Sequence, residues 1–344
     1  MSQPAIDALS VFPRVSLLAG PTPIERLARV EAALGPALGP ALGSVALWVK
    51  RDDLIGLGGG GNKLRKLEFL LGAAQAQGAD TIITLGGRQS NHARLTAAAA
   101  ARMGMAAELV LVRMVPRTDR DYVDNGNVLL DELFGARVHD LPAGSDALAF
   151  AEERAQALRS SGRNVYVAPS GGSSPTGCLG YAACAEEIAL QARALGLSFD
   201  RVIVPNGSSG THAGLAAGFA ALGQSARLVK SFAVLNPADV ARQATWEKAA
   251  ATASLIGAGP IGRDEIEVAG DQLGAGYGIP TDAMIAAVRL MARQEGLLLD
   301  PVYSGKAFAG LLEDVARRRF GPGANVLFVM TGGTPSLFSY RSVF

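Results

Sequence analysis

The chain has 344 residues, of which 49% are hydrophobic and 18% charged, and its formal net charge is +1. This length and hydrophobic content suit two domains or one large α/β unit, and they exclude an intrinsically disordered chain. A near-neutral chain in which positive and negative residues are interspersed lacks the basic surface that nucleic-acid binding needs. We therefore expect a small-molecule partner and no nucleic acid.

The cysteine and histidine content limits the possible chemistry further. Cys178 and Cys184 are the only cysteines, and the three histidines are His92, His139 and His212. Two thiols cannot build a disulfide framework or a complete zinc site, so we predict no metal and a reducing, cytoplasmic environment. The alanine-rich stretches are too short to cross a bilayer, so we predict no membrane span.

Short β-branched runs alternate with alanine- and leucine-rich segments through most of the chain. We predict strands at 46–50, 81–85, 108–113, 164–168, 201–205, 227–234 and 325–330. We predict helices at 63–77, 91–103, 147–160, 180–195, 212–222, 282–295 and 306–319. This alternation is typical of an α/β fold whose mostly parallel sheets carry helices on their faces. The Ala-Leu-Gly-Pro repeat at 32–44 is interpreted as a loop insertion.

Four segments of glycine and small polar residues follow predicted strands. They are GGGGNK at 58–63, GGRQSNH at 86–92, NGSSGTH at 206–212 and TGGTP at 331–335. Ligands of open parallel sheets bind outside the carboxyl ends of the strands. We therefore expect these segments to share one site.

The segment 207–211 lies between a predicted strand and the start of a predicted helix. Free backbone N–H groups, hydroxyl groups and the helix dipole together favour a phosphate dianion at such a position. An ordinary helix end capped by serine is the alternative interpretation.

Lys63 begins a predicted helix directly after the glycine run. Residues 56–61 formally match the dinucleotide pattern G-x-G-x-x-G, but the acidic residue required at the end of the second strand is missing, since Asp80 instead precedes its strand. A helix amino end disfavours a protonated lysine, so the Lys63 amine is kept neutral and nucleophilic. The neighbouring Arg65 and Lys66 are expected on the solvated surface.

Two further groups of residues are candidates for a site. Ser90 is a plausible helix N-cap, and the free N–H groups beside it could bind a substrate carboxylate. His92 is interpreted as a structural hydrogen-bonding residue, and no role is assigned to His139 or His212. Tyr277 and Tyr303 lie beside or near glycines and are either active-site rings or core residues.

Taken together, these segments resemble the fold-type II enzymes dependent on pyridoxal 5′-phosphate (PLP), the tryptophan synthase β family. The more specific resemblance is to the branch of D-cysteine desulfhydrase, L-cysteate sulfo-lyase and 1-aminocyclopropane-1-carboxylate (ACC) deaminase. It begins at FPRV (12–15), continues through WVKRDD (48–53) and ends at GGTPSLF (332–338). The combination of GNKxRKLE with QSNH is specific to it.

The resemblance implies a fold and an assembly. The fold is tryptophan synthase β-like, with two three-layer α/β domains and mostly parallel sheets. Residues 1–65 and 177–344 would form the large PLP-binding domain, and residues 66–176 the small domain. Family members are commonly homodimers.

The resemblance also implies roles for matching residues. Lys63 matches the Schiff-base lysine, and the catalytic set would comprise Lys63, Ser90, Tyr277 and Tyr303. The cofactor-binding set would add Asn91, which binds the phenolic oxygen, the phosphate loop and two later residues: Gly207, Ser208, Ser209, Gly210, Thr211, Ser304 and Thr331. The substrate-binding set would comprise Ser90, Asn91, His92 and Arg88.

Residue 304 helps to choose within the branch, because ACC deaminases carry glutamate there, opposite the pyridine nitrogen. The neutral Ser304 gives a weaker electron sink, which suffices for β-elimination. His92 also replaces the glutamine common in ACC deaminases. We therefore predict α,β-elimination from a small amino acid, with D-cysteine desulfhydrase activity favoured.

Several alternatives stay open at this point. L-Cysteate sulfo-lyase and ACC deaminase-type ring opening are the rivals within the branch. A nucleotide-binding protein and a PLP-binding regulatory protein without turnover are rivals from other classes. Arg88 is either a surface residue or a pocket residue that selects an anionic leaving group such as sulfonate.

Overall fold

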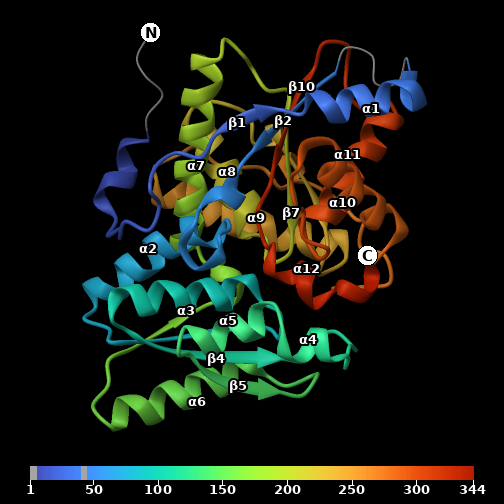
Figure 1. Ribbon diagram of the computed structural model, residues 1–344. Helices are drawn as coiled ribbons and strands as arrows, with labels where there is room; N and C mark the ends of the chain where they lie inside the picture. Colours follow the sequence, from blue (N-terminus) through green and yellow to red (C-terminus); the bar gives the residue numbers. More distant parts are fainter. Residues whose placement is uncertain (1–5, 40–44) are drawn as a thin grey trace.

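The computed structural model describes residues 6–39 and 45–344, which fold around two sheets (Figure 1). The larger sheet has the order β1-β2-β10-β7-β8-β9, and the smaller has the order β5-β4-β3-β6. Neighbouring strands pair in parallel except β1 with β2. The larger sheet comprises β1 (Ile24–Arg26), β2 (Ala46–Lys50), β7 (Arg201–Asn206), β8 (Val229–Ala233), β9 (Glu267–Ala269) and β10 (Asn325–Val329). The smaller comprises β3 (Thr81–Gly87), β4 (Ala106–Val112), β5 (Arg137–Leu141) and β6 (Val165–Ala168).

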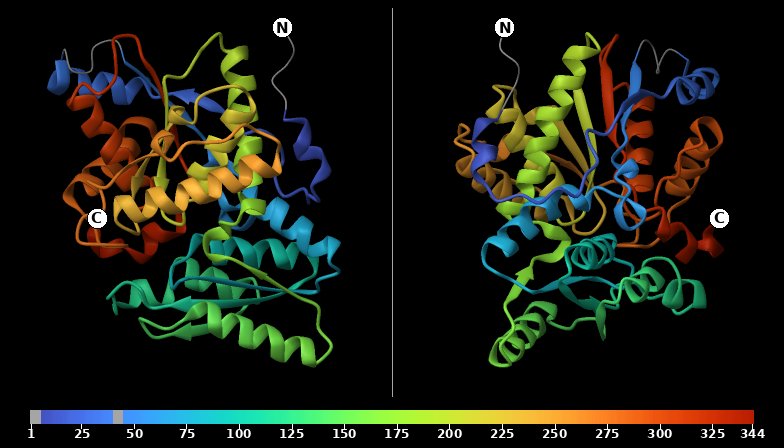
Figure 2. Two further views of the ribbon diagram at one scale, coloured as in Figure 1. Left: turned by 180° about the vertical axis from the view of Figure 1, so that it is seen from behind. Right: turned by 60° about the vertical axis from the view of Figure 1, so that its left-hand side comes forward.

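Helices cover both faces of the larger sheet, as Figure 2 shows from the side. Successive side chains of a strand point to opposite faces of the sheet, so alternate residues of β10 pack against the helix layers on the two faces. Val326 and Phe328 pack with α1 (Ala28–Leu38), α10 (Asp282–Glu295) and α11 (Ser304–Ala316). Leu327 and Val329 pack instead with α7 (Pro175–Ala194) and α8 (Gly210–Ala221), beside α9 (Ala238–Leu255).

The smaller sheet is likewise covered on both faces. Ile82 of β3 packs with α2 (Lys63–Ala76) and α3 (Asn91–Met103), while Ile83 packs with α6 (Ala147–Ser160). The short helix α5 (Asn127–Leu133) packs against α3, and α4 (Arg120–Asp124) and α12 (Pro335–Ser339) pack against α5 and against each other. Among the described residues, no helix combines the length and apolar character needed to cross a membrane.

The predicted α/β fold with mostly parallel sheets is confirmed, and each predicted strand forms. The helices predicted at 91–103, 147–160 and 282–295 have the observed bounds. The loop interpretation of 32–44 is wrong for 32–38, because α1 continues to Leu38 and buries Val30 on the sheet. Residues 40–44 lie outside the described part of the chain.

Several elements were not predicted. Strands β1 and β9 have three residues each and lie at the edges of their sheet, and β5 is an edge strand without a buried residue. Helix α9 and the short helices α4, α5 and α12 were not predicted either. The small sheet takes its strands from 81–168, and α2 packs on both α3 and α7. Domain boundaries at 65/66 and 176/177 stay a prediction.

Candidate active site

One cavity lies at the carboxyl ends of β7 and β10. It is lined by residues of all four glycine-containing segments, together with Pro205 and one tyrosine: Asn62, Lys63, Asn91, Gly207, Ser208, Ser209, Gly210, Thr211, Tyr303 and Thr331. The segments therefore meet at the sheet edge where parallel α/β folds bind ligands.

The segment 207–211 turns sharply from β7 into α8. Ser209 has φ +72°, in the left-handed region, and its hydroxyl donates to the Asn206 side chain at 3.2 Å. The Ser208 hydroxyl hydrogen-bonds Ser173 at 2.7 Å. Both serine side chains are thus engaged by the protein, while the first turn of α8 has N–H groups without intrahelical partners. An anion in this loop would be bound mainly through the backbone.

Lys63 begins α2 and carries its amine to the edge of this loop. A Cβ atom on Gly171 would lie 3.7 Å from the Lys63 Nζ and 2.1 Å from the Ser208 Oγ, so the lysine and the loop meet across Gly171. Burial of the amine lowers the pKa of Lys63 to about 8. A substantial neutral fraction near neutral pH makes this amine a nucleophile for an aldehyde.

The surface prediction for Arg65 and Lys66 is wrong. Their exposed fractions are 3% and 0%, because α2 is packed between α3 and α7. The Lys66 Nζ donates to the Gly171 carbonyl at 3.2 Å and to the Ser173 hydroxyl at 3.0 Å. Burial and the charge of Lys63 hold the pKa of Lys66 well below its usual range. Lys66 thus belongs to the same polar cluster as Lys63.

Asn91 begins α3, and its amide is held in one orientation. Its Oδ1 accepts from the Asn127 Nδ2 at 2.9 Å, the Ser336 hydroxyl at 3.4 Å and the Arg94 guanidinium at 3.5 Å. The Nδ2 lies toward Gly333, where a Cβ atom would be 2.7 Å away. Asn91 can therefore offer only a hydrogen-bond donor to the cavity. Among its partners, only Arg94 had a sequence signal, its spacing of three on one helix face.

The start of α3 has the predicted N-cap. The Ser90 hydroxyl accepts from the Ala93 N–H at 3.1 Å. The His92 ring is buried and hydrogen-bonds Thr84 at 2.9 Å, as expected of a structural histidine. Burial and two nearby lysines hold the pKa of His92 well below its usual range, so its ring is neutral. Only its backbone N–H group is placed to join Ser90 in binding a carboxylate.

The two candidate tyrosines contact each other. The Tyr277 and Tyr303 hydroxyl groups are 2.6 Å apart, and burial raises the pKa of both phenols. Tyr303 also packs on the loop, since a Cβ atom on Gly207 would lie 3.0 Å from its ring. The Ser304 hydroxyl donates to the Asp300 carboxylate at 2.7 Å and does not line the cavity.

Arg88 lies at the carboxyl edge of the small sheet and does not line the cavity. Its guanidinium pairs with Asp140 at 3.0 Å, and Arg113 binds the same carboxylate at 2.9 Å. The Arg88 side chain is 22% exposed. An anionic substrate group would have to compete with Asp140 for this arginine.

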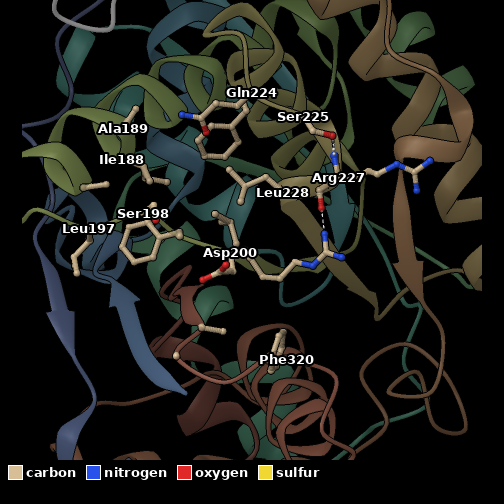
Figure 3. A pocket seen from close by; sticks show the side chains of 18 of the residues that line it. Ile188, Ala189, Leu197, Ser198, Asp200, Gln224, Ser225, Arg227, Leu228 and Phe320 are labelled. Atoms are coloured by element: carbon tan, nitrogen blue, oxygen red, sulfur yellow. Dashed lines mark hydrogen bonds between the residues drawn. The ribbon is translucent and has the colours of Figure 1, made fainter. Parts of the chain in front are cut away.

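A larger pocket lies at the opposite edge of the large sheet, where β7 and β10 begin (Figure 3). Ile188, Leu228 and Phe320 line it together with exposed polar residues such as Arg227. Several of its charged groups already have partners, among them Arg227 with Asp264. Pocket size therefore does not identify the candidate active site. The candidate is the smaller cavity, because it contains Lys63 and the glycine-containing segments.

The cavity residues fit the chemical groups of PLP. Lys63 would supply an amine for the aldehyde, and the 207–211 loop at the α8 amino end would supply an anion site for the phosphate. Asn91 offers a donor suited to the phenolic oxygen. No carboxylate lines the cavity among the described residues, so nothing there repels a phosphate.

Comparisons with known proteins agree with this fit. Residues 15–332 match the family model described as pyridoxal-phosphate dependent enzyme. D-cysteine desulfhydrase of Serratia proteamaculans (strain 568) is 42% identical over 339 residues, covering 97% of each chain. D-cysteine desulfhydrase of Salmonella choleraesuis (strain SC-B67) is 41% identical over 340 residues, covering 97% of this chain and 98% of its own.

A solved structure of an ACC deaminase homologue superimposes with a TM-score of 0.86 at 36% identity, covering 100% of this chain and 98% of its own. An O-ureido-L-serine synthase, 19% identical, superimposes with a TM-score of 0.64 over 98% of this chain and 95% of its own, which supports the fold alone. The chain is a member of the family of enzymes dependent on pyridoxal phosphate, with the fold-type II architecture.

Proposed function

We propose that this protein is a D-cysteine desulfhydrase, which converts D-cysteine to pyruvate, ammonia and sulfide with PLP held by Lys63. The observation that carries the proposal is the position of the half-buried Lys63 amine beside the 207–211 loop. The substrate assignment rests on relatives of that name, 41–42% identical over almost the whole chain.

Bound PLP would supply the electron sink that stabilises a carbanion at the substrate Cα. The protein supplies orientation and proton transfer around it. The free N–H groups at the start of α3, with the Ser90 hydroxyl, are suited to binding the substrate carboxylate. The fixed Asn91 amide would donate to the cofactor's phenolic oxygen, and Thr331 closes the cavity wall.

Lys63 is the best placed general base for the α-proton, because burial keeps part of its amine neutral near neutral pH. The tyrosine pair suits the opposite role. Burial keeps the phenols of Tyr277 and Tyr303 protonated, and one of them donates to the other. The pair can therefore offer a hydrogen bond to the departing sulfur, because a raised pKa keeps the O–H proton on the phenol.

Two related activities are rival outcomes. ACC ring opening is supported by the 36% identical ACC deaminase homologue. Ser304 counts against it, because its hydroxyl is engaged by Asp300 and residue 304 offers no carboxylate. L-Cysteate elimination would use Arg88, which the Asp140 ion pair counts against. A changed preference between L-cysteate and D-cysteine in Arg88→Ala would support that use of Arg88.

The proposal is tested by keto-acid release from D-cysteine, L-cysteine, L-cysteate, β-chloro-D-alanine, D-serine and ACC. We expect D-cysteine to give the highest kcat/KM. The purified protein should show a visible absorption band with PLP, and Lys63→Ala should abolish both the band and turnover, a loss of at least about 10³-fold. Lys230→Ala is the matched lysine control. A protein that stays colourless with added PLP would contradict the proposal.

We also propose a homodimer in a reducing cytoplasm. Leu298, Phe338 and Phe344 are 43%, 60% and 40% exposed and line one apolar depression, which suits a subunit contact. Both cysteines are free and buried, as suits a reducing compartment. Sedimentation analysis of wild type and Phe338→Asp tests the dimer: a monomeric wild type would contradict it.

A further inference from the structure

Lys306 is a fully buried lysine that the proposed chemistry does not use. It occupies the third position of α11, and its exposed fraction is 0%. Burial lowers its pKa to about 8. Among the described residues it has no ion pair, and its Nζ donates only to the carbonyl groups of Leu273 at 2.7 Å and Gly276 at 3.0 Å. The charge is therefore balanced by two backbone dipoles alone.

The position of Lys306 is unfavourable for stability in two ways. A buried ammonium without a carboxylate loses much of its hydration energy. A positive charge in the first turn of a helix is also opposed by the helix dipole. Both effects destabilise the protein. We therefore look for a role of Lys306 in the segment whose carbonyl groups it binds.

That segment, 271–281, connects β9 to α10 without a helix or strand of its own. Three of its glycines have positive φ, at Gly274, Gly276 and Gly278. Its backbone carbonyl groups need partners from outside, and Lys306 supplies two of them. The Tyr340 hydroxyl supplies a third by donating to the Gly278 carbonyl at 2.8 Å.

Tyr277 directly follows one of the two carbonyl groups that Lys306 holds. Its hydroxyl meets that of Tyr303, which directly precedes α11. On its other side, a Cβ atom on Gly87 of the small sheet would lie 3.6 Å from the Tyr277 ring. Tyr277 thus stands between the two sheets, and Lys306 ties its segment to the helix that follows Tyr303.

We propose that Lys306 is a positioning residue that holds the Tyr277 segment against α11, so that the Tyr277 and Tyr303 hydroxyl groups stay within hydrogen-bond distance. The amine acts through backbone carbonyl groups and touches no reacting atom. The functional half of this inference rests on the proposed role of the tyrosine pair in elimination. Its structural half concerns only the anchoring of 271–281.

A double-mutant cycle tests the functional half. Lys306→Met removes the donors and keeps the stem, and we expect it to lower kcat/KM for D-cysteine at least about tenfold, the size of a lost charged hydrogen bond. In a Tyr277→Phe background the same substitution should cost less than about twofold. Lys230→Met is the control, because Lys230 binds Asp314 of α11 at 2.6 Å and does not contact the segment. Equal losses in both backgrounds would overturn the functional half.

Amide hydrogen exchange of the PLP-free protein tests the structural half without turnover. Exchange within 271–281 should be at least about tenfold faster in Lys306→Met than in wild type and Lys230→Met. Unchanged exchange would overturn the anchoring. If Lys306→Met does not fold, Lys306→Gln keeps a donor and should show a smaller change in the same direction. If exchange is faster in Lys306→Met but the wild type does not turn over D-cysteine, the proposed function is contradicted and the anchoring is supported.

Discussion

Two buried charged regions of this protein differ in how their charges are balanced. The first joins α2 to α7 and β2. There Arg65 donates to Asp52 at 2.8 Å and to Glu187 at 2.8 Å, and Lys50 pairs with the same glutamate at 2.5 Å. The Tyr181 hydroxyl donates to Asp52 at 2.7 Å. Two cations face two anions, and each is hydrogen-bonded.

The second region surrounds the candidate active site, and its charges are poorly balanced. The Lys66 amine donates to two neutral groups, the Gly171 carbonyl and the Ser173 hydroxyl, and it has no ion pair among the described residues. Arg94 donates to the carbonyl groups of Gly58 and Gly60, and its Nε has no hydrogen-bond partner among the described residues. Both carboxylate oxygens of Asp131 also lack hydrogen-bond partners there, and the charge of Arg94 only partly offsets the effect of burial on the pKa of Asp131. Burial raises the pKa of Asp131 to about 8.

The difference separates two uses of buried charge. A compensated network tolerates burial and fixes the packing of the elements that it joins. Burial without such compensation shifts the pKa of a group so that its neutral form is favoured. Shifts of this kind cluster at functional sites. On this basis we expect the α2–α7 network to be structural, and we expect the groups around Lys63 to serve cofactor binding. Substitutions in the two regions should therefore fail differently.

The largest stability effect is expected in the compensated network. Arg65→Met leaves the buried Asp52 without an ion-pair partner and Glu187 paired only with Lys50, and it should destabilise the protein by about 3–5 kcal/mol. Denaturant unfolding measures this, with Arg120→Met as control, because the 94% exposed Arg120 makes only a long surface pair. A loss below about 1 kcal/mol in Arg65→Met would show that the network is not structural.

Much of this contrast could not be predicted from the sequence. The glycine segments and Lys63 were found, because strand ends followed by glycine mark ligand sites in parallel sheets. The burial of Arg65 and Lys66 was missed, because α2 contacts helices from distant parts of the chain on both sides. Asn127 was missed for a similar reason, since tertiary packing alone brings it to Asn91.

Strand and helix prediction shows the same limit. The central strands were found because both of their faces are buried and their β-branched runs are continuous. The edge strand β5, with sequence RVHDL and no buried residue, carries no such pattern. Helix α1 was taken for a loop because of its glycine and proline, although packing of Val30 on the large sheet stabilises it.

A smaller effect with a defined pH dependence is expected at Asp131. Its folded pKa is raised to about 8, so between pH 4 and pH 8 the folded state binds a proton that the unfolded state has lost. Stability therefore falls as pH rises through this range and levels off above pH 8. Asp131→Asn removes this loss. Relative to wild type, it should gain about 1–3 kcal/mol between pH 6 and pH 9.

Urea unfolding at several pH values measures this difference. Glu132→Gln removes a charge from the exposed neighbouring position of α5 and serves as the control. A stability difference between Asp131→Asn and wild type that stays constant from pH 6 to pH 9 would mean that Asp131 is ionised throughout. The second region would then be better compensated than its hydrogen bonds suggest.

The smallest effect is expected at Asn127, which makes no contact with the cavity itself. Its Nδ2 fixes the Asn91 amide, and Asn127→Leu would free that amide to rotate away from the donating orientation. Loss of one oriented hydrogen bond corresponds to about 1 kcal/mol, or about fivefold weaker binding of PLP. Spectroscopic titration of the PLP-free protein with PLP measures this affinity.

Asn127→Asp sharpens the test, because it places a carboxylate oxygen against the Asn91 Oδ1 and should weaken PLP binding more than Asn127→Leu does. Asn125→Asp is the matched control in the same loop, since its oxygen can still accept from the Gly126 N–H, as it does at 2.7 Å. If both Asn127 variants lost thermal stability but bound PLP as tightly as wild type, Asn127 would belong with the structural network. The region that serves the candidate site would then be smaller and would not include Asn127.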